Sequence, residues 1–323
     1  MIAYYSSLAM VTSAVLYLVA MTMHAAEWAS VRTSRTSRTS QPAVVAVGGN
    51  AAAGSTGADG DSDDAKAGPE KTRREDVLGR LGLGITVIAA LTHVLGVVLR
   101  GIAAERAPWG NMYEFITTSL AIAVLTYLVL AWKFGMRWLG LPVTLLLTVG
   151  QGLAVTVFYV NVSELMPALH SVWFVIHIIA AATSGAAFNI GGIAAILYLI
   201  RSRDEELGGS GGYLSRLPSA EVLDRISYRF LAFAFPLWTF TVAAGAIWAQ
   251  YAWGRFWGWD PKETMSLVTW IIYAGYLHAR VTVGWKGRRA AIVAIVGLAS
   301  FWFNFVGINL LVSGLHSYSG IPR

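Results

Sequence analysis

The sequence predicts an all-α polytopic membrane protein with about eight transmembrane helices and both termini outside. Of its 323 residues, 56% are hydrophobic and only 13% are charged, and the mean hydropathy is +0.57, well above the range of soluble domains. Several apolar segments reach the roughly 20 residues that a helix needs to cross a bilayer. Basic residues gather between alternate segments, which predicts the orientation of the chain.

The first apolar segment has no basic residue before it and no small-residue cleavage site, so we expect a retained span rather than a signal peptide. Each later segment is expected to be helical because a span in lipid must satisfy its own backbone hydrogen bonds. None has the alternating pattern of an outer-membrane barrel. The predicted spans are 2–23, 78–99, 115–132, 139–158, 170–200, 227–248, 266–283 and 290–312.

A polar segment separates the first two spans. It opens with three Arg-Thr-Ser repeats between Arg32 and Ser40 and continues through Ala, Gly, Ser and Asp, with too little apolar surface to offset chain entropy. We therefore expect three parts: a first transmembrane helix over 1–23, a disordered cytoplasmic linker over 24–76, and a transmembrane domain over 77–323.

Charge and composition also exclude some classes of function. Placing the linker on the cytoplasmic side leaves few basic residues outside, so the net charge of +6 reports orientation in the lipid bilayer and not nucleic-acid binding. The chain has no cysteine, so a metal ligand must be His, Met, Tyr or a carboxylate. The outer basic residues are Arg100, Arg106, Arg255, Lys262 and Arg323.

The external loop 249–265 predicts a ligand platform. Four aromatic rings fall within seven residues, and two glycines between them leave room for a planar ligand near the backbone. The loop's cations suit carboxylates such as heme propionates, and this density exceeds that of an interfacial aromatic belt. The predicted cofactor-binding residues are Trp253, Gly254, Arg255, Phe256, Trp257, Trp259, Asp260 and Lys262.

The end of this loop also has a structural interpretation. Asp260 precedes Pro261, and Glu263 follows three residues later, which is the pattern of a capping box at the start of a helix. We assign Asp260 and Glu263 to this cap. Asp260 is also the loop's one candidate for proton transfer, and no catalytic residue is assigned firmly.

Six histidines are candidate iron ligands, because imidazole is a common axial ligand of heme and is costly inside a membrane. His316 follows the eighth span, and either His170 or His177 of the fifth could oppose it across a heme. These two lie seven residues apart on one helix face, about 10 Å along the axis, so geometry leaves both open. His278 lies toward the cytoplasmic side of the seventh span, His93 lies in the outer half of the second, and His24 borders the linker without an assigned role.

Several ordered motifs resemble the WWD-domain heme-handling proteins, and among them the CcsA/ResC family of cytochrome c biogenesis, named CcsB in some bacteria. The resemblance covers roughly residues 80–320. It rests on the run Phe256-Trp257-Gly258-Trp259-Asp260-Pro261-Lys262-Glu263-Thr264 and on 245–250, 252–254, 276–280 and 307–318, with weaker matches over 108–114 and 169–177.

This resemblance implies System II cytochrome c maturation at the cytoplasmic membrane of a bacterium, with the WWD loop on the extracytoplasmic side. Residues 77–323 would handle heme b, deliver it outward and attach it to the Cys-x-x-Cys-His thiols of apocytochrome c, together with a ResB-like partner. Heme lyase activity would need that partner. The family pattern favours His177 and His316 as external ligands, keeps His170 in reserve and makes His278 the transmembrane ligand.

Two other functions fit a chain of this class. A membrane heme protein for quinone-linked electron transfer would need histidines paired at depth, whereas these are single and scattered. A small-molecule transporter would need interrupted helices and internal repeats, of which Gly191-Gly192 in the fifth span is a weak sign.

Overall fold

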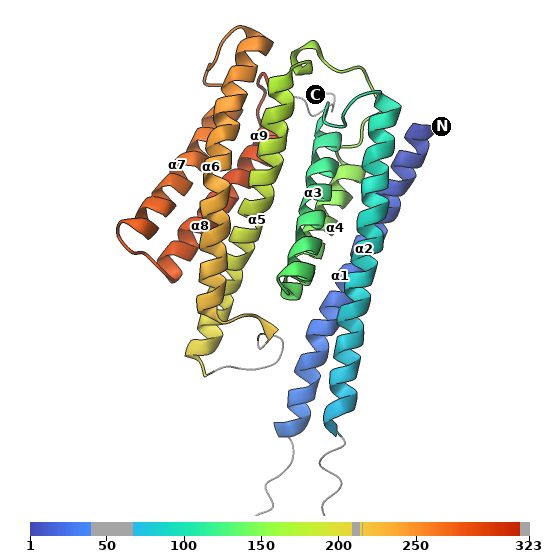
Figure 1. Ribbon diagram of the computed structural model, residues 1–323, viewed down its shortest axis with the longest axis vertical. Helices are drawn as coiled ribbons and strands as arrows, with labels where there is room; N and C mark the ends of the chain where they lie inside the picture. The colour runs from blue at the N-terminus through green and yellow to red at the C-terminus, as the bar shows by residue number, and fades with distance from the viewer. Residues whose placement is uncertain (40–66, 209–213, 215, 317–323) are drawn as a thin grey trace, which may run out of the picture.

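Figure 1 shows the chain as a computed structural model, which describes residues 1–39, 67–208, 214 and 216–316. Those residues form helices and loops and contain no strand. The helices are α1 (Ile2–Thr39), α2 (Ala67–Ala104), α3 (Met112–Lys133), α4 (Gly140–Thr156), α5 (Val172–Glu206), α6 (Ala220–Trp253), α7 (Pro261–Val281), α8 (Arg288–Trp302) and α9 (Ile308–Leu311). Short 3-10 helices cover Arg137–Leu139 and Pro167–Leu169, and a π-helical turn, Phe303–Gly307, joins α8 to α9.

Seven helices of the described residues are long and apolar enough to cross a membrane. They correspond to seven of the eight predicted spans, and α8, the π-helical turn and α9 together make the last. The remaining predicted span, 266–283, is α7, which is long enough at 21 residues but has a more polar sequence than those seven. The all-helical membrane architecture is confirmed.

The first two helices are longer than predicted. We expected a disordered linker from residue 24, but α1 continues to Thr39 and α2 begins at Ala67. The prediction fails at the first end of the linker because 24–30 is unlike the repeats after it: His24 is buried and Glu27 accepts a bond from Arg216 at 2.6 Å. The middle of the predicted linker, 40–66, lies outside the described residues.

The helices form two groups (Figure 1). In one group, α1 packs along α2, and α3 and α4 lie beside them. In the other group, α5 packs along α6, α8 packs against α5, and α7 packs against α6 and α8. Helix α5 runs unbroken through Gly191 and Gly192, where a Cβ would meet Leu231 of α6 at 2.7 Å and Leu298 of α8 at 2.5 Å. These glycines thus permit close helix packing, and the break expected of a transporter is absent from α5.

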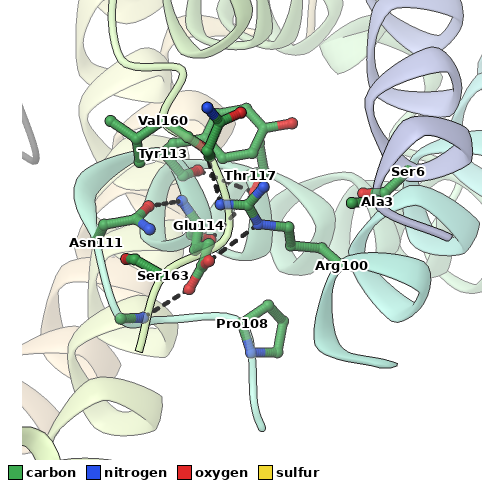
Figure 2. Close-up of polar contacts among 12 residues, drawn as sticks. Ala3, Ser6, Arg100, Pro108, Asn111, Tyr113, Glu114, Thr117, Val160 and Ser163 are labelled. Carbon is green, nitrogen blue, oxygen red and sulfur yellow. Dashed lines mark hydrogen bonds and ion pairs between the residues drawn. The ribbon is translucent and has the colours of Figure 1, made fainter. Parts of the chain in front are cut away.

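The loop between α2 and α3 and the loop after α4 are joined by an ion-pair network that the sequence did not reveal (Figure 2). Glu114, in the first turn of α3, is fully buried and accepts a bond from Arg100 Nε at 2.9 Å. It also accepts a bond from Arg106 Nη1 at 2.7 Å. The same arginines donate to the carbonyls of Val160 and Ser163 in the loop after α4. One carboxylate therefore links α2, α3 and that loop. Both arginines form their ion pairs within the protein.

Candidate functional site

The candidate site is an apolar cavity between the two helix groups. Its walls come from α3, α4, α5, α6 and the α8–α9 segment, and the start of α7 closes one side. Among the predicted site residues, the cavity is lined by Phe256, Trp257, Lys262, His177 and His316. Two of the three predicted iron ligands therefore face one space, although they are far apart in the sequence.

The His177 ring packs against one face of helix α6. Thr241, Gly245 and Trp248 are spaced four and three residues apart, so they share one face of the helix. The His177 Nδ1 lies 2.9 Å from the Thr241 carbonyl oxygen, and a Cβ at Gly245 would stand 2.8 Å from that nitrogen. Since a carbonyl only accepts, Nδ1 carries the proton and Nε2 keeps the lone pair that binds a metal.

Asp260 holds His316 in the same tautomer. Its Oδ2 lies 2.8 Å from His316 Nδ1, and its Oδ1 accepts the Leu315 amide at 2.7 Å. Burial alone would raise the pKa of Asp260, but the bonds from His316 and Leu315 lower it to about 2. The carboxylate is ionised at neutral pH, so it accepts from Nδ1–H and leaves Nε2 of His316 free.

Burial also keeps the His316 imidazole neutral. Desolvation lowers the pKa of His316 below the ordinary 6.5, and this outweighs the opposite effect of the Asp260 hydrogen bond. A metal-binding imidazole must be unprotonated. His316 meets this requirement at neutral pH.

One tryptophan joins the two histidines. The Trp248 ring stacks on His177, with centroids 5.9 Å apart and an interplanar angle of 19°, and meets His316 edge-on at 5.5 Å. Its indole nitrogen donates to the Ala168 carbonyl at 2.8 Å, in the short 3-10 helix before α5. Trp248 was not among the predicted site residues, because it lies within a predicted span where an aromatic side chain is ordinary core.

The predicted aromatic platform divides into three environments. Phe256 and Trp257 line the cavity, as expected of a ligand surface. Trp253 instead packs edge-on against His316 at 4.8 Å and against Trp248 at 4.9 Å, so it contacts the ring of a predicted ligand and not the cavity. Trp259 is 67% exposed and is not in the cavity wall.

The glycines and the arginine of this loop have local structural functions. Gly254 caps α6 in the left-handed conformation, with φ 71°, which glycine adopts without strain. At Gly258 a Cβ would overlap the Arg255 guanidinium, which bonds Glu263 Oε1 at 3.3 Å. Arg255 is thus paired within the loop, and Lys262 is the cation that lines the cavity.

The capping box predicted at Asp260 is confirmed. Asp260 accepts from the Lys262 amide at 3.3 Å, and Glu263 accepts from the Asp260 amide at 3.1 Å. The Asp260 carboxylate oxygens accept hydrogen bonds from the Lys262 amide, the Leu315 amide and His316. These bonds make Asp260 a cap and a support for His316, which leaves it little capacity as a general acid or base.

The other two predicted ligands lie outside the cavity. His170 is exposed and follows the short helix before α5, whereas His177 is in the cavity wall. His278 is exposed in the last turn of α7, with Nδ1 3.4 Å from Thr282 Oγ1. Because α7 begins at Pro261, His278 lies about 25 Å along the helix from the loop, deeper than the predicted span implied.

Comparisons with known proteins identify the family of this chain. Residues 88–316 match the family described as "Cytochrome C assembly protein". "Cytochrome c biogenesis protein CcsA" of Gloeobacter violaceus is 35% identical over 299 residues, covering 76% of this chain and 88% of that protein. The same protein of Porphyra purpurea is 32% identical, covering 75% and 88%. The chain belongs to the CcsA family.

A solved structure extends the comparison to the fold. This CcsA-family chain is similar to "Cytochrome c Heme Lyase CcmF", with a TM-score of 0.60 and 11% sequence identity, over 98% of the chain. The chain spans about half of that structure, 48% of its length. The likeness therefore concerns the fold of one part of a larger protein.

These results describe a multi-pass membrane protein of cytochrome c maturation. Both ends of the described CcsA chain lie at the loop's end of the molecule: α1 starts there in Figure 1, and His316 contacts Asp260. Which side of the membrane this end faces stays a prediction.

Asp260 offers a test of how far the support of His316 matters. We expect Asp260→Ala to weaken heme binding by about 10- to 100-fold, the usual effect of losing a hydrogen-bond partner of a metal-binding histidine. Asp260→Asn keeps an acceptor and a cap, so its loss should be smaller. Titration of the purified variants with heme, followed by absorption, measures both; equal and normal affinity in both would contradict the assignment.

Proposed function

We propose that this protein delivers heme b across the cytoplasmic membrane of a bacterium and holds it for covalent attachment to apocytochrome c in System II maturation. The heme is cargo and substrate, bound by His177 and His316 in the apolar cavity. Lys262 would neutralise a propionate there, while Phe256 and Trp257 would contact the macrocycle.

One observation carries this proposal. Two imidazoles from separate elements line one apolar cavity. Each donates a hydrogen bond from Nδ1 to a fixed acceptor: His177 to the Thr241 carbonyl and His316 to the Asp260 carboxylate. Such partners orient metal-binding histidines and raise their basicity. Two interfacial histidines that bind no metal would have no reason to share the same tautomer.

Attachment adds each thiol of the apocytochrome Cys-x-x-Cys-His motif across a heme vinyl group. The sulfur bonds to one vinyl carbon and the proton goes to the other, so no atom is lost. This chain has no cysteine and its Asp260 is engaged in the cap. Its contribution would be positioning, which can supply on the order of 7–11 kcal/mol. Heme lyase activity would arise in complex with a ResB-like partner.

An absorption spectrum of the purified protein with its partner tests the function. We expect heme to copurify and to give the Soret and visible bands of bis-imidazole coordination. A pure, folded complex that neither carries heme nor takes it up on titration would contradict the proposal.

His278 is the proposed entry ligand, with an opposing ligand from the partner. It is exposed on α7 and no described residue other than Thr282 bonds its ring, so its second face is open to a neighbouring protein. We expect His278→Ala to lower the heme content of the complex several-fold, because loading precedes the external site. The check is heme per protein by pyridine hemochrome, with exposed His170→Ala as control; normal loading in His278→Ala would exclude this route.

A further inference from the structure

Trp259 is the one loop tryptophan whose backbone is strained. Its φ is 58°, in the left-handed region that a bulky side chain rarely adopts. Its ring is 67% exposed and stands perpendicular to that of Trp257, with an interplanar angle of 89° and centroids 5.8 Å apart. Trp257 lines the cavity, so the two neighbouring indoles serve different surfaces.

The strained conformation is held from both sides. The amides of Gly258 and Asp260, which flank Trp259, both donate to Glu263 Oε2, at 2.9 and 3.1 Å. Glu263 is itself bound by Arg255, and the Asp260 side chain is bound by Leu315 and His316. Strain that the surroundings over-determine in this way is typical of functional positions.

Two simpler explanations account poorly for this arrangement. A ring that only anchors the protein at the lipid interface needs no fixed backbone, because the interface accepts many orientations. A ring that contacts the cargo would line the cavity, whereas Trp259 does not. Phe256, 58% exposed, lies in the cavity wall and so links that wall to the outer surface.

We propose that Trp259 is a positioning residue for the polypeptide that receives the heme, and that its exposed indole packs against the apocytochrome segment carrying the two thiols. This inference rests on the proposed function and adds a surface to it. Exposed tryptophans are frequent anchors of protein interfaces, and a rigidly displayed ring loses little entropy on binding. The site then has an inner face for heme and an outer face for protein.

The test uses the full chain in complex with its partner and a synthetic peptide containing Cys-x-x-Cys-His. Trp259→Gly removes the ring and relaxes the backbone, so it should fold and keep its heme. We expect unchanged heme content and an unchanged maximal attachment rate, but a half-saturating peptide concentration raised about 10-fold. Trp259→Phe should restore most of the affinity.

Controls separate the outcomes. Trp257→Ala should instead lower heme content, and Tyr251→Ala, which removes another exposed ring at the end of α6, should change neither quantity. If Trp259→Gly loses heme in parallel with activity, the ring contacts cargo and the inference is overturned. If it changes nothing, the ring is a lipid anchor and the inference is again overturned. Absence of heme from the unaltered complex would count against the proposed function, not against this step.

Discussion

Purified His316→Ala complex should contain little or no heme. The substitution removes one proposed axial ligand and also one hydrogen-bond partner of the buried Asp260 carboxylate, which keeps the amides of Lys262 and Leu315. A single remaining imidazole, His177, would hold the iron by one bond in a cavity that is otherwise mostly apolar. We expect the heme content to fall at least about 10-fold, by analogy with the loss of supporting residues alone.

The spectrum distinguishes ligand loss from misfolding. His177→Ala should give the same loss, since it removes the opposing ligand, whereas His170→Ala should retain a normal spectrum because His170 is outside the cavity. All three proteins should elute alike on size exclusion. Normal heme in His316→Ala, or loss confined to His170→Ala, would show that the ligand pair is assigned wrongly.

Glu114→Ala is expected to destabilise the fold strongly, because Glu114 is the centre of the ion-pair network that joins α2, α3 and the loop after α4. The change leaves the buried Arg100, 1% exposed, and the partly buried Arg106 without their carboxylate. Removing one partner of a buried ion pair costs about 3–5 kcal/mol, because the remaining charge is desolvated and unpaired. The effect should appear as a lower free energy of unfolding in mixed micelles.

The order of related variants tests the network. Arg100→Ala should cost less than Glu114→Ala, since Arg106 still neutralises Glu114, and Arg106→Ala should cost least because its side chain is 13% exposed. Glu164→Ala removes an exposed carboxylate of the neighbouring loop and should be nearly neutral. Equal stability of Glu114→Ala and Glu164→Ala would show that the pairs contribute nothing.

The helices were largely predictable because lipid imposes length and hydropathy on each span. The start of α7 was predictable as well, since Asp260, Pro261 and Glu263 form a local pattern that needs no tertiary contact. The ends of α1 and α2 were not, because residues such as His24 gain their helical context from packing against α2 and α4. Composition averaged over 24–76 concealed that difference.

The site was predictable only in part. Ring density pointed to the loop, but the direction of each ring in irregular backbone depends on contacts between distant residues. The pairing of Asp260 with His316 joins positions 56 residues apart, and the Arg255–Glu263 bond withdraws a cation that the sequence left available. The sequence signal for Trp248 was its spacing from Thr241 and Gly245, which places all three on the face of α6 that contacts His177.

The two hydrogen bonds that aim the imidazoles differ in kind. His316 relies on a side chain, Asp260, whereas His177 relies on the main-chain carbonyl of Thr241. Every residue type carries that carbonyl, so no replacement at position 241 deletes the acceptor itself. A substitution at position 260 can therefore change the basicity of His316 directly. The hydrogen bond of His177 changes only if the backbone of α6 moves.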